Sequence, residues 1–519
     1  MTERFDVVVV GAGHNGLACA GYLARSGKRV LVLEANHAPG GCAATREFAS
    51  GFSVSACAQW LYQLHPEVSR ELALESHGLQ WVARNLDSIS LSADGQHLTL
   101  SGDSVSGAEP GDEKALAAFN ARNRKFTKLL ASLFSQRAPK LAEANLTDRL
   151  TLAKLGLGLK MLGKEDMSEF MRIALINMYD LMQETFGSKS LQALLSMDAV
   201  LGARMGPRTP GTVFGYLYRQ LSADFGFSGP GLVRGGMGAL GDAMAASARA
   251  SGVELRMSSP VASLALEADR VTGVNLADGT QVEAPIVVSG VDPVTTFRDL
   301  VGYRHIEAGT ARRVSEIRNG SGTAKLHLAL DGLPDFTGLD AGQLGQRLVI
   351  APDMDYVERA FNAVKYDESS AEPVMDISIP TLHDDSLAPA GQHVLSAIVQ
   401  WAPYEPDGGW ERHRQPFVDT LLDLLARYAP DIRERVVAAE LLTPQDLEQE
   451  FGMTGGHWHH GELSLDQVLM NRPFPGSSQY GTPVDGLYLC GAGAHPGGGL
   501  MGLAGRNSAK EIIKRGASA

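Results

Sequence analysis

Three glycines near the start of the chain have the spacing that holds a pyrophosphate. Gly11, Gly13 and Gly16 form a G-x-G-x-x-G motif directly after the apolar run 7–10, and Glu34 ends the next apolar run. The first glycine allows a tight turn, the second lets the backbone approach the phosphates, and the third lets the following helix pack on the strand. A carboxylate at Glu34 accepts hydrogen bonds from a ribose diol and disfavours a 2′-phosphate. The motif therefore predicts a site for the adenosine half of FAD or NAD.

Two further glycine-rich segments could approach the same cofactor. Gly40 and Gly41 follow the second apolar run and suit a close backbone approach to a phosphate or a ribityl chain. Residues 487–507 read LYLCGAGAHPGGGLMGLAGRN, an apolar strand that runs into a glycine-rich turn and then a helix. We therefore expect one cofactor held from both ends of the chain, with the remaining sequence inserted between them.

Another G-x-G-x-x-G, formed by Gly236, Gly238 and Gly241, does not predict a second nucleotide site. The residues before it, FSGPGLVRG, resemble a loop rather than a buried strand, and no acid follows at the required distance. A nucleotide-binding motif needs both features. We interpret this segment as a turn that opens a helix, and we expect no separate NAD(P)H domain.

The four cysteines bear on redox chemistry. A disulfide reductase needs two cysteines a few residues apart, because one thiolate attacks and its partner resolves the mixed disulfide. Cys42 follows Gly41, but the next cysteine along the chain is Cys57, and Cys19 and Cys490 lie far away. We therefore exclude disulfide reductase chemistry and expect Cys42 to be a small packed side chain. The absence of a C-x-x-C pair and of a secreted disulfide framework favours a reducing compartment.

The segment 455–462, GGHWHHGE, places three histidines and a carboxylate close together. The H-x-H-H spacing is not that of metal ligands, so we expect no metal. His457 or His460 could act as a general acid or base near neutral pH, whereas a surface loop is the alternative for either residue. His495, beside Pro496, is either a cofactor contact or a structural hydrogen-bonding residue.

Lys325 interrupts the apolar strand TAKLHLAL at 323–330. A buried lysine needs a partner or a lowered pKa, and either would suit a role in moving a proton or positioning a water molecule. On periodicity alone the side chain could equally point outward from an alternating strand. The strand pattern leaves these two alternatives open.

The elements that position these residues indicate a discontinuous cofactor domain. The four valines at 7–10 predict a parallel strand buried on both faces. Helical periodicity dominates 111–200 and recurs at 416–430, while Asp278-Gly279 predicts a hairpin. The apolar segment 150–162 is interpreted as core, the alternative being a lid or a membrane-touching face.

We predict an α/β fold with a Rossmann-like cofactor domain and an inserted substrate domain made of a mixed sheet and helices. The expected ranges are 1–100, 230–300 and 470–519 for the cofactor domain, 101–229 for a helical lid region, and 301–469 for the substrate-binding domain.

Composition limits the partners and the location of this 519-residue chain. A net charge of −13 opposes simple attraction to nucleic acid or to an anionic membrane. No stretch reaches 18 apolar residues, so we expect no transmembrane segment, although peripheral membrane contact stays open. The first strand begins near Phe5, which leaves no room for a targeting peptide, and we expect a cytoplasmic protein. Homo-oligomerisation is left open.

Four segments together carry a family resemblance. They are TPGTVFGYL, VRGGMGALGDA, LTPQDLEQEFGMTGGHWHHGELSLDQ and LYLCGAGAHPGGGLMGLAGRN, and they are scattered over nearly the full length. The chain resembles flavoproteins of the phytoene desaturase and amine oxidase superfamily, closest to the branch called pyridine nucleotide-disulfide oxidoreductase domain-containing protein 2. The resemblance implies non-covalent FAD and FAD-binding and substrate-binding domains that are intertwined along the sequence.

The resemblance assigns roles to particular residues. Besides the residues of the two N-terminal turns, it implies that Val261 contacts the adenosine and pyrophosphate side through its backbone. It places the pyrophosphate, ribityl chain and flavin pyrimidine against Gly491, Ala492, Gly493 and a helix start near Met501. It also implies that Lys325 acts near the flavin, because amine oxidase relatives use a lysine on the corresponding strand to hold a water molecule.

The expected activity is hydride transfer between an apolar or partly apolar organic substrate and flavin N5, as in desaturases. The alternatives are an amine oxidase, a saturase or isomerase, and a flavin-bound regulatory protein without catalysis. The resemblance disfavours amine oxidation, because monoamine oxidase-like members carry a glutamate soon after the C-terminal glycine and an aromatic residue over the flavin. Here Gly493 carries no carboxylate, and Gly498, Gly499 and Leu500 cannot form an aromatic wall. Oxygen or a quinone is the expected electron acceptor.

Overall fold

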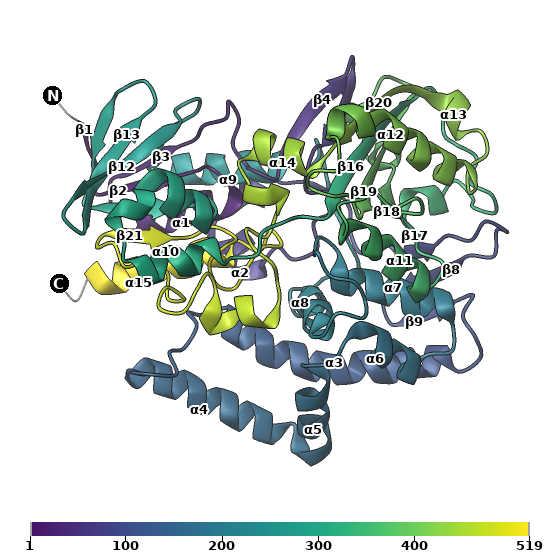
Figure 1. The fold of residues 1–519 in the computed structure, drawn as a ribbon, viewed down its shortest axis with the longest axis horizontal. Helices are drawn as coiled ribbons and strands as arrows, with labels where there is room; N and C mark the ends of the chain where they lie inside the picture. The colour runs from purple at the N-terminus through teal and green to yellow at the C-terminus, as the bar shows by residue number, and fades with distance from the viewer. Residues whose placement is uncertain (1–2, 517–519) are drawn as a thin grey trace.

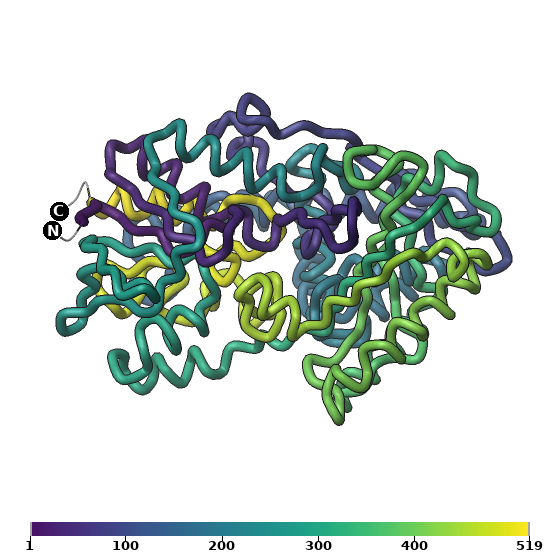
Figure 2. Tube along the Cα trace, turned by 90° about the horizontal axis from the view of Figure 1, so that it is seen from above, coloured from purple at the N-terminus to yellow at the C-terminus, as the bar shows by residue number. Residues whose placement is uncertain are grey.

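One end of the molecule is built on a parallel sheet to which both ends of the chain contribute. The computed structural model describes residues 3–516, and Figure 2 shows the purple N-terminal and yellow C-terminal segments side by side at this end. The sheet order is β11 (Glu254–Arg256), β3 (Val30–Leu33), β2 (Val7–Val10), β15 (Ile286–Ser289) and β21 (Leu487–Leu489). All of these pairs are parallel. Strands from three distant parts of the sequence therefore form one sheet.

Both faces of this sheet are covered, as the valine run predicts. Val7 and Val9 face a core that includes helix α1 (His14–Arg25). Val8 and Val10 face the opposite core, against the sheet of β1 (Glu3–Arg4), β14 (Gln281–Glu283), β13 (Arg270–Leu276) and β12 (Val261–Glu267). Helices α9 (Gly238–Ala250) and α15 (Leu503–Gly516) pack beside α1.

The predicted hairpin at Asp278-Gly279 is confirmed. Strands β13 and β14 pair antiparallel, Asn275 lies opposite Gln281, and the Thr280 carbonyl accepts from the Leu276 amide. Gly279 has a φ of 88°, which an L side chain rarely adopts, so glycine is required at this turn.

The other end is a mixed eight-stranded sheet. Its order is β20 (Val436–Leu442), β16 (Thr323–Leu330), β19 (His393–Gln400), β18 (Val374–Ser378), β17 (Arg347–Ile350), β7 (Ser88–Ser90), β8 (Leu98–Ser101) and β9 (Ser104–Ser106). Helix α12 (Trp410–Ala426) covers one face; it begins earlier than the predicted 416–430 and ends earlier too. The predicted α/β class, with a Rossmann-like domain beside a mixed-sheet and helical domain, is confirmed.

Helices fill the space between and beside the two sheets (Figure 1). They are α2 (Pro66–Glu71), α3 (Asp112–Phe134), α4 (Leu146–Met161), α5 (Gly163–Ile173), α6 (Met178–Thr185), α7 (Lys189–Val200), α8 (Thr212–Asp224), α10 (Ala308–Ser315), α11 (Met354–Val364), α13 (Ile432–Arg435) and α14 (Pro444–Phe451). Two short ribbons complete the fold, β4 (Thr45–Ala49) with β5 (Phe52–Ser55) and β6 (Trp81–Ala83) with β10 (Leu232–Val233). Strand β7 and most of β8 fall within 1–100 but join the eight-stranded sheet, and the domain boundaries stay a prediction.

The interpretation of 150–162 as core is wrong. Helix α4 extends away from the sheets at the bottom of Figure 1. Leu146, Leu150, Leu157 and Met161 are 54–78% exposed. The segment is apolar on two sides, and only the side bearing the half-buried Leu152, Leu155 and Leu159 faces the protein, so helical periodicity could not tell it from a buried helix. None of the helices formed by residues 3–516 combines the length and hydropathy that crossing a bilayer requires.

Candidate functional site

A cleft of about 380 Å³ opens beyond the carboxyl ends of the parallel strands. This central cleft is where ligands bind in open α/β sheets. Nine residues predicted to contact the cofactor line it: Gly11, Gly13, Gly16, Glu34, Gly40, Gly41, Val261, Gly491 and Ala492. The structure thus brings together turns from both ends of the chain, although contact with the cofactor itself stays a prediction for each residue.

The three glycines of the first turn play different structural parts. A Cβ atom at Gly13 would meet nothing within 4 Å, so this position opens on the cleft. A Cβ at Gly16 would lie 2.2 Å from the Gly11 carbonyl oxygen, so Gly16 is required for packing between turn and helix. The amides of the first turn of α1, which begins at His14, therefore face a space that a phosphate can enter.

Glu34 and the second glycine turn, at Gly40 and Gly41, both hydrogen-bond to the first turn. Glu34 accepts from the Ala12 amide at 2.6 Å and from the Asn36 amide at 2.9 Å, which leaves further lone pairs on its carboxylate for a ribose. The Gly40 amide donates to Ala12 at 2.9 Å. A Cβ at Gly241 would lie 2.6 Å from the Gly40 Cα, so the second glycine motif packs against this turn, as expected for a structural role.

Of the four residues predicted to contact the cofactor at the C-terminal turn, Gly491 and Ala492 line the cleft, whereas Gly493 and Met501 do not. A Cβ at Gly491 would lie 2.4 Å from the Gly290 carbonyl oxygen, so glycine permits a backbone crossing there. Gly493 lies against Pro293 and does not line the cleft. Met501 is buried outside the lining, its carbonyl accepts from the His65 amide at 3.3 Å, and α15 begins two residues later at Leu503.

Arg472 fixes the C-terminal turn to the histidine segment. The guanidinium of this buried residue donates to the carbonyls of Ala492 (2.9 Å), Gln467 (3.1 Å) and Glu462 (3.2 Å). It also donates to the carbonyls of His459 and Gly461. Burial lowers the pKa of Arg472 to about 10, so it keeps its charge at pH 7. Sequence analysis missed this residue, since nothing in the motif pattern marks it.

Three histidine rings lie at the cleft wall with free ring nitrogens. Nε2 of His14, Nδ1 of His459 and Nδ1 of His460 are buried without a hydrogen-bond partner, and all three residues line the cleft. Unpaired buried polar atoms are costly, so a polar ligand is expected opposite them. Together with the open space at Gly13, these atoms fit the phosphates, ribityl chain and polar ring edge of FAD.

The histidine segment is more deeply buried than predicted. Burial lowers the pKa of His460 to about 4, so this ring is neutral at pH 7 and the expected titration near neutrality is wrong for it. A neutral imidazole can still donate or accept a hydrogen bond. His457 is fully buried behind the cleft wall, with its Nε2 3.6 Å from Glu462 Oε1. The alternative of a surface loop is wrong for both residues.

Lys325 does not line the cleft itself, but it hydrogen-bonds to a residue that does. Strand β16 is buried along its whole length, so the outward-pointing alternative is wrong. Lys325 Nζ donates to Gln59 Oε1 at 2.6 Å and to Ser396 Oγ at 3.0 Å, and Gln59 lines the cleft. Burial lowers the pKa of Lys325 to about 7. The amine can therefore exchange a proton near neutral pH.

The cleft wall beyond the nucleotide-binding turns is apolar and aromatic. It includes Trp60, Tyr62, Leu201, Ile398, Trp458 and Leu500. Sequence analysis looked for aromatic residues only near Gly498–Leu500 and missed those contributed by 60–62 and 458. The run Gln59-Trp60-Leu61-Tyr62, between a strand and a helix, is the signal that could have indicated them.

Cys42 and Cys57 both line the cleft, although they are distant in sequence. The hairpin of β4 and β5 brings them together: the Ala58 amide donates to the Cys42 carbonyl at 3.0 Å. The neighbouring Cys42 thiol and burial raise the pKa of Cys57, so Cys57 stays a neutral thiol at pH 7. Because thiol exchange needs a thiolate, Cys57 is unsuited to be the attacking thiol of a disulfide reductase.

The remaining predicted polar residues are placed as follows. His495 is buried, and its Nε2 hydrogen-bonds the Leu133 carbonyl at 3.2 Å, which favours its structural alternative. Within residues 3–516, no group of three His, Cys, Asp or Glu side chains is arranged to hold a metal ion.

Comparisons with known proteins agree with this geometry. Residues 16–513 match the family described as Flavin containing amine oxidoreductase. The chain is 34% identical over 547 residues to pyridine nucleotide-disulfide oxidoreductase domain-containing protein 2 of Rattus norvegicus, covering 99% of this chain and 94% of that protein. It is 28% identical over 544 residues to a limonene dehydrogenase subunit of Castellaniella defragrans, covering 99% and 95%. A solved structure of a putrescine oxidase variant is similar in fold, with a TM-score of 0.65, 16% identity and 100% coverage of both chains.

Proposed function

The chain belongs to the flavin-containing amine oxidoreductase family and is an FAD-dependent oxidoreductase, and we propose that it dehydrogenates an apolar or partly apolar organic substrate. The similarity to a limonene dehydrogenase subunit supports a hydrocarbon-like substrate. Bound FAD would supply an acceptor for the hydride at its N5 atom.

The observation that carries this proposal is the composition of the cleft wall. Besides the glycine turns, the lining includes the apolar side chains of Trp60, Ile398 and Trp458. The carboxylates that line the cleft are engaged elsewhere, Glu34 by backbone amides and Glu450 by an arginine. An apolar pocket with few polar groups binds apolar molecules and excludes water from the reacting bond. A cationic amine would lose its hydration there without gaining a free carboxylate partner.

Lys325 and Gln59 would manage the proton that accompanies hydride loss. Gln59 holds the Lys325 amine through its side-chain oxygen and forms part of the wall itself. With a pKa near 7, the neutral amine can accept a proton through a water molecule at this wall. Lys325 is thus a positioning and proton-accepting residue behind the cleft, and His460 supplies a neutral hydrogen-bonding edge.

We further propose that the protein is cytoplasmic and that oxygen or a quinone reoxidises its bound flavin.

We also propose that helix α4 touches a membrane surface. The exposed leucines of α4 lie beside Arg149, Lys154 and Lys160, which are also exposed. An apolar stripe flanked by cations is typical of helices that lie on anionic bilayers.

Anaerobic reduction of the bound flavin tests the proposed substrate class. FAD-loaded protein is mixed with limonene or with putrescine, and bleaching of the oxidised flavin absorbance is followed. We expect limonene and related terpenes to reduce the flavin faster than putrescine. Faster reduction by the amine would favour the amine oxidase alternative. Reduction by no donor, together with no reoxidation by oxygen or a quinone, would favour a non-catalytic flavin protein.

A further inference from the structure

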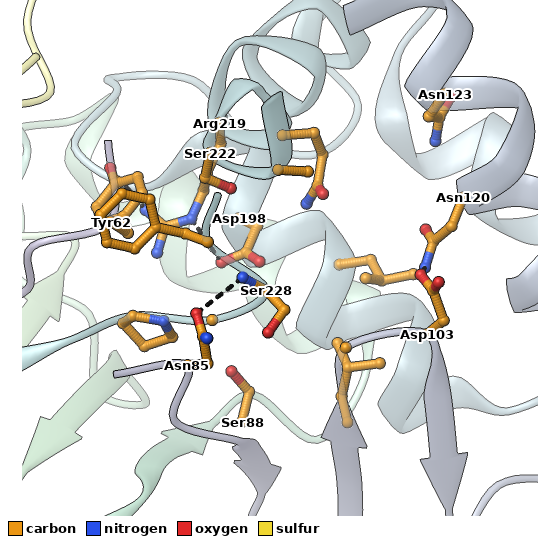
Figure 3. Close-up of a pocket in the computed structure, with 18 of the residues that line it drawn as sticks. Tyr62, Asn85, Ser88, Asp103, Asn120, Asn123, Asp198, Arg219, Ser222 and Ser228 are labelled. Atoms are coloured by element: carbon orange, nitrogen blue, oxygen red, sulfur yellow. Dashed lines mark hydrogen bonds and ion pairs between the residues drawn. The ribbon is translucent and has the colours of Figure 1, made fainter. Parts of the chain in front are cut away.

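The structure contains a second cavity of about 360 Å³ (Figure 3). Its walls are helices α3, α7 and α8, strands β7 and β8, and the loop 226–230. Among residues 3–516, Tyr62 is the one residue that lines both this polar cavity and the central cleft. The polar cavity is therefore a separate compartment that adjoins the cleft at a single side chain.

Tyr62 is held in place between the two compartments. The guanidinium of Arg219 stacks on its ring at 4.2 Å, and Arg219 Nη1 donates to the Tyr62 hydroxyl at 3.1 Å. Arg219 Nε also pairs with Asp198 at 3.1 Å. The Tyr62 ring is therefore held in place between the two cavities, because the Tyr62 hydroxyl and Asp198 both fix the guanidinium that stacks on the ring.

The inner wall of the polar cavity is charged but electrically balanced. Asp198 pairs with Arg219 and with Arg347, at 2.8 Å, and Arg347 also pairs with the buried Asp376 at 2.9 Å. Burial favours the neutral form of Asp198, but the two guanidinium groups outweigh it and lower its pKa. At the mouth, Arg124 is paired with Asp103. The cavity thus offers an ionic ligand no unpaired charge.

Besides these charged groups and several apolar side chains, the lining includes neutral hydrogen-bonding side chains. Asn123 on α3 is 4% exposed, and its Nδ2 has no hydrogen-bond partner. Gln220 on α8 and Ser222 also line the cavity (Figure 3 labels Asn123 and Ser222). A buried amide without a partner costs free energy that a ligand hydroxyl or carbonyl would recover. The unpaired Asn123 donor therefore indicates a ligand-binding site rather than a packing gap between helices.

We propose that the polar cavity binds a neutral polyhydroxylated small molecule, which is distinct from the substrate oxidised at the flavin. Amide groups, hydroxyl groups and aromatic edges are the partners that a polyol ring uses, and paired charges add donors and acceptors without selecting an ion. An apolar molecule would leave the Asn123 amide unpaired. A charged one would have to break an ion pair that is already formed.

Ligand-observed NMR on the FAD-loaded full-length protein tests the proposal without any turnover. The probes are myo-inositol, D-glucose and glycerol, with myo-inositol 1-phosphate as the charged comparator and cyclohexanol as the apolar one. We expect saturable binding of at least one neutral polyol, and at least tenfold weaker binding of both comparators. No saturable polyol binding, or tighter binding of a comparator, would overturn the proposal. Because no redox step is measured, failure here leaves the proposed dehydrogenase activity untouched.

Two variants on different helices of the cavity wall, α3 and α8, locate the binding. Asn123→Leu keeps the number of side-chain heavy atoms and Gln220→Leu removes one; each removes an amide, and each is expected to weaken polyol binding at least tenfold. Gln415→Leu, the same substitution at an exposed position of α12, should change nothing. The variants are compared at equal FAD content and equal thermal midpoint. If one variant fails to fold, the other still decides. Polyol affinity unchanged in a folded variant would contradict the assignment.

Discussion

Gly13 and Gly16 belong to one turn, but a side chain at Gly13 should affect FAD binding and a side chain at Gly16 should affect folding stability. Alanine at Gly13 would meet empty cleft, and the backbone angles there (φ −65°, ψ 163°) suit any residue. Alanine at Gly16 would collide with the Gly11 carbonyl. Gly13→Ala should therefore weaken FAD binding at least tenfold while changing apoprotein stability by less than about 0.5 kcal/mol. Fluorescence titration with FAD and urea unfolding measure the two effects.

The matched control is Gly16→Ala. Overpacking there should lower the unfolding free energy of the apoprotein by about 1–3 kcal/mol. If both variants lost stability equally, Gly13 would not face a free cleft, and if both kept full affinity, the turn would not hold the cofactor.

Lys325 should give the enzyme a pH dependence centred near 7. The lowered pKa keeps the amine protonated below pH 7 and neutral above it, so a proton-accepting amine predicts flavin reduction that speeds up as pH rises through 7. Lys325→Met should remove this step and slow reduction about 100-fold at pH 8. Stopped-flow absorbance at several pH values measures it, and Lys114→Met on the exposed start of α3 is the control. An unchanged profile would exclude the role.

At the residue scale, sequence predicted positions better than environments. The glycines and Glu34 were identifiable because their types follow from backbone geometry and ribose chemistry. The burial of Lys325 and the lowered pKa of His460 were not, because both depend on strands and loops that come from elsewhere in the chain. Trp60 and Tyr62 carried no motif, so only the fold could show that they line the cleft.

At the scale of elements, Arg472 joins the histidine segment and the C-terminal turn through hydrogen bonds to their carbonyls. Its guanidinium satisfies carbonyls of the histidine segment and of the C-terminal turn. Arg472→Met would leave these buried carbonyls unpaired and should lower the unfolding free energy by about 3–5 kcal/mol. It should also weaken FAD binding, since Ala492 lines the cleft. Denaturant unfolding measures the first effect and flavin titration the second.

A surface arginine gives the comparison. Arg433 pairs with Asp423 in partial exposure, so Arg433→Met should cost no more than about 1 kcal/mol. Equal losses for the two variants would mean that the carbonyl cluster around Arg472 contributes little.

Helix α4 shows where periodicity misleads. The leucines on one side of α4 pack on the protein, whereas those on the other side are exposed. Helical periodicity alone therefore does not distinguish this exposed helix from a buried one. Its one acidic residue, Asp148, is buried and paired with Arg137 at 3.1 Å, so the exposed side of α4 carries only cations in a chain of net charge −13. Such a side is attracted to anionic lipid despite the charge of the whole protein.

Replacing two exposed leucines tests this surface. Leu150→Glu with Leu157→Glu should reduce binding to phosphatidylglycerol vesicles at least tenfold, because it removes apolar area and adds negative charge. Co-sedimentation measures the partitioning, and phosphatidylcholine vesicles show whether charge contributes. Val437→Glu, at an exposed apolar position on β20, is the control. Wild-type protein that binds neither vesicle would contradict membrane contact.

At the scale of the whole molecule, the parallel sheet explains why the two chain ends act together. Strand β15 pairs with β2 on one side and with β21 on the other, so the N-terminal and C-terminal turns emerge from the two strands that flank β15. The sequence indicated this shared cofactor grip through two glycine motifs. It did not indicate the second, polar cavity, because no sequence motif links the polar residues that helices α3, α7 and α8 contribute there.

Binding of FAD should therefore protect both turns in one step. Ligand that binds only the folded state stabilises it by about 2.7 kcal/mol at a concentration 100 times its dissociation constant. Hydrogen exchange followed by mass spectrometry should show slower exchange at 11–16 and 490–502 over the same range of FAD concentration. The exposed helix α4 should be unaffected and serves as the internal control. Protection confined to 11–16 would mean that the C-terminal turn closes the sheet without holding the cofactor, because a shared ligand must stabilise every segment that contacts it.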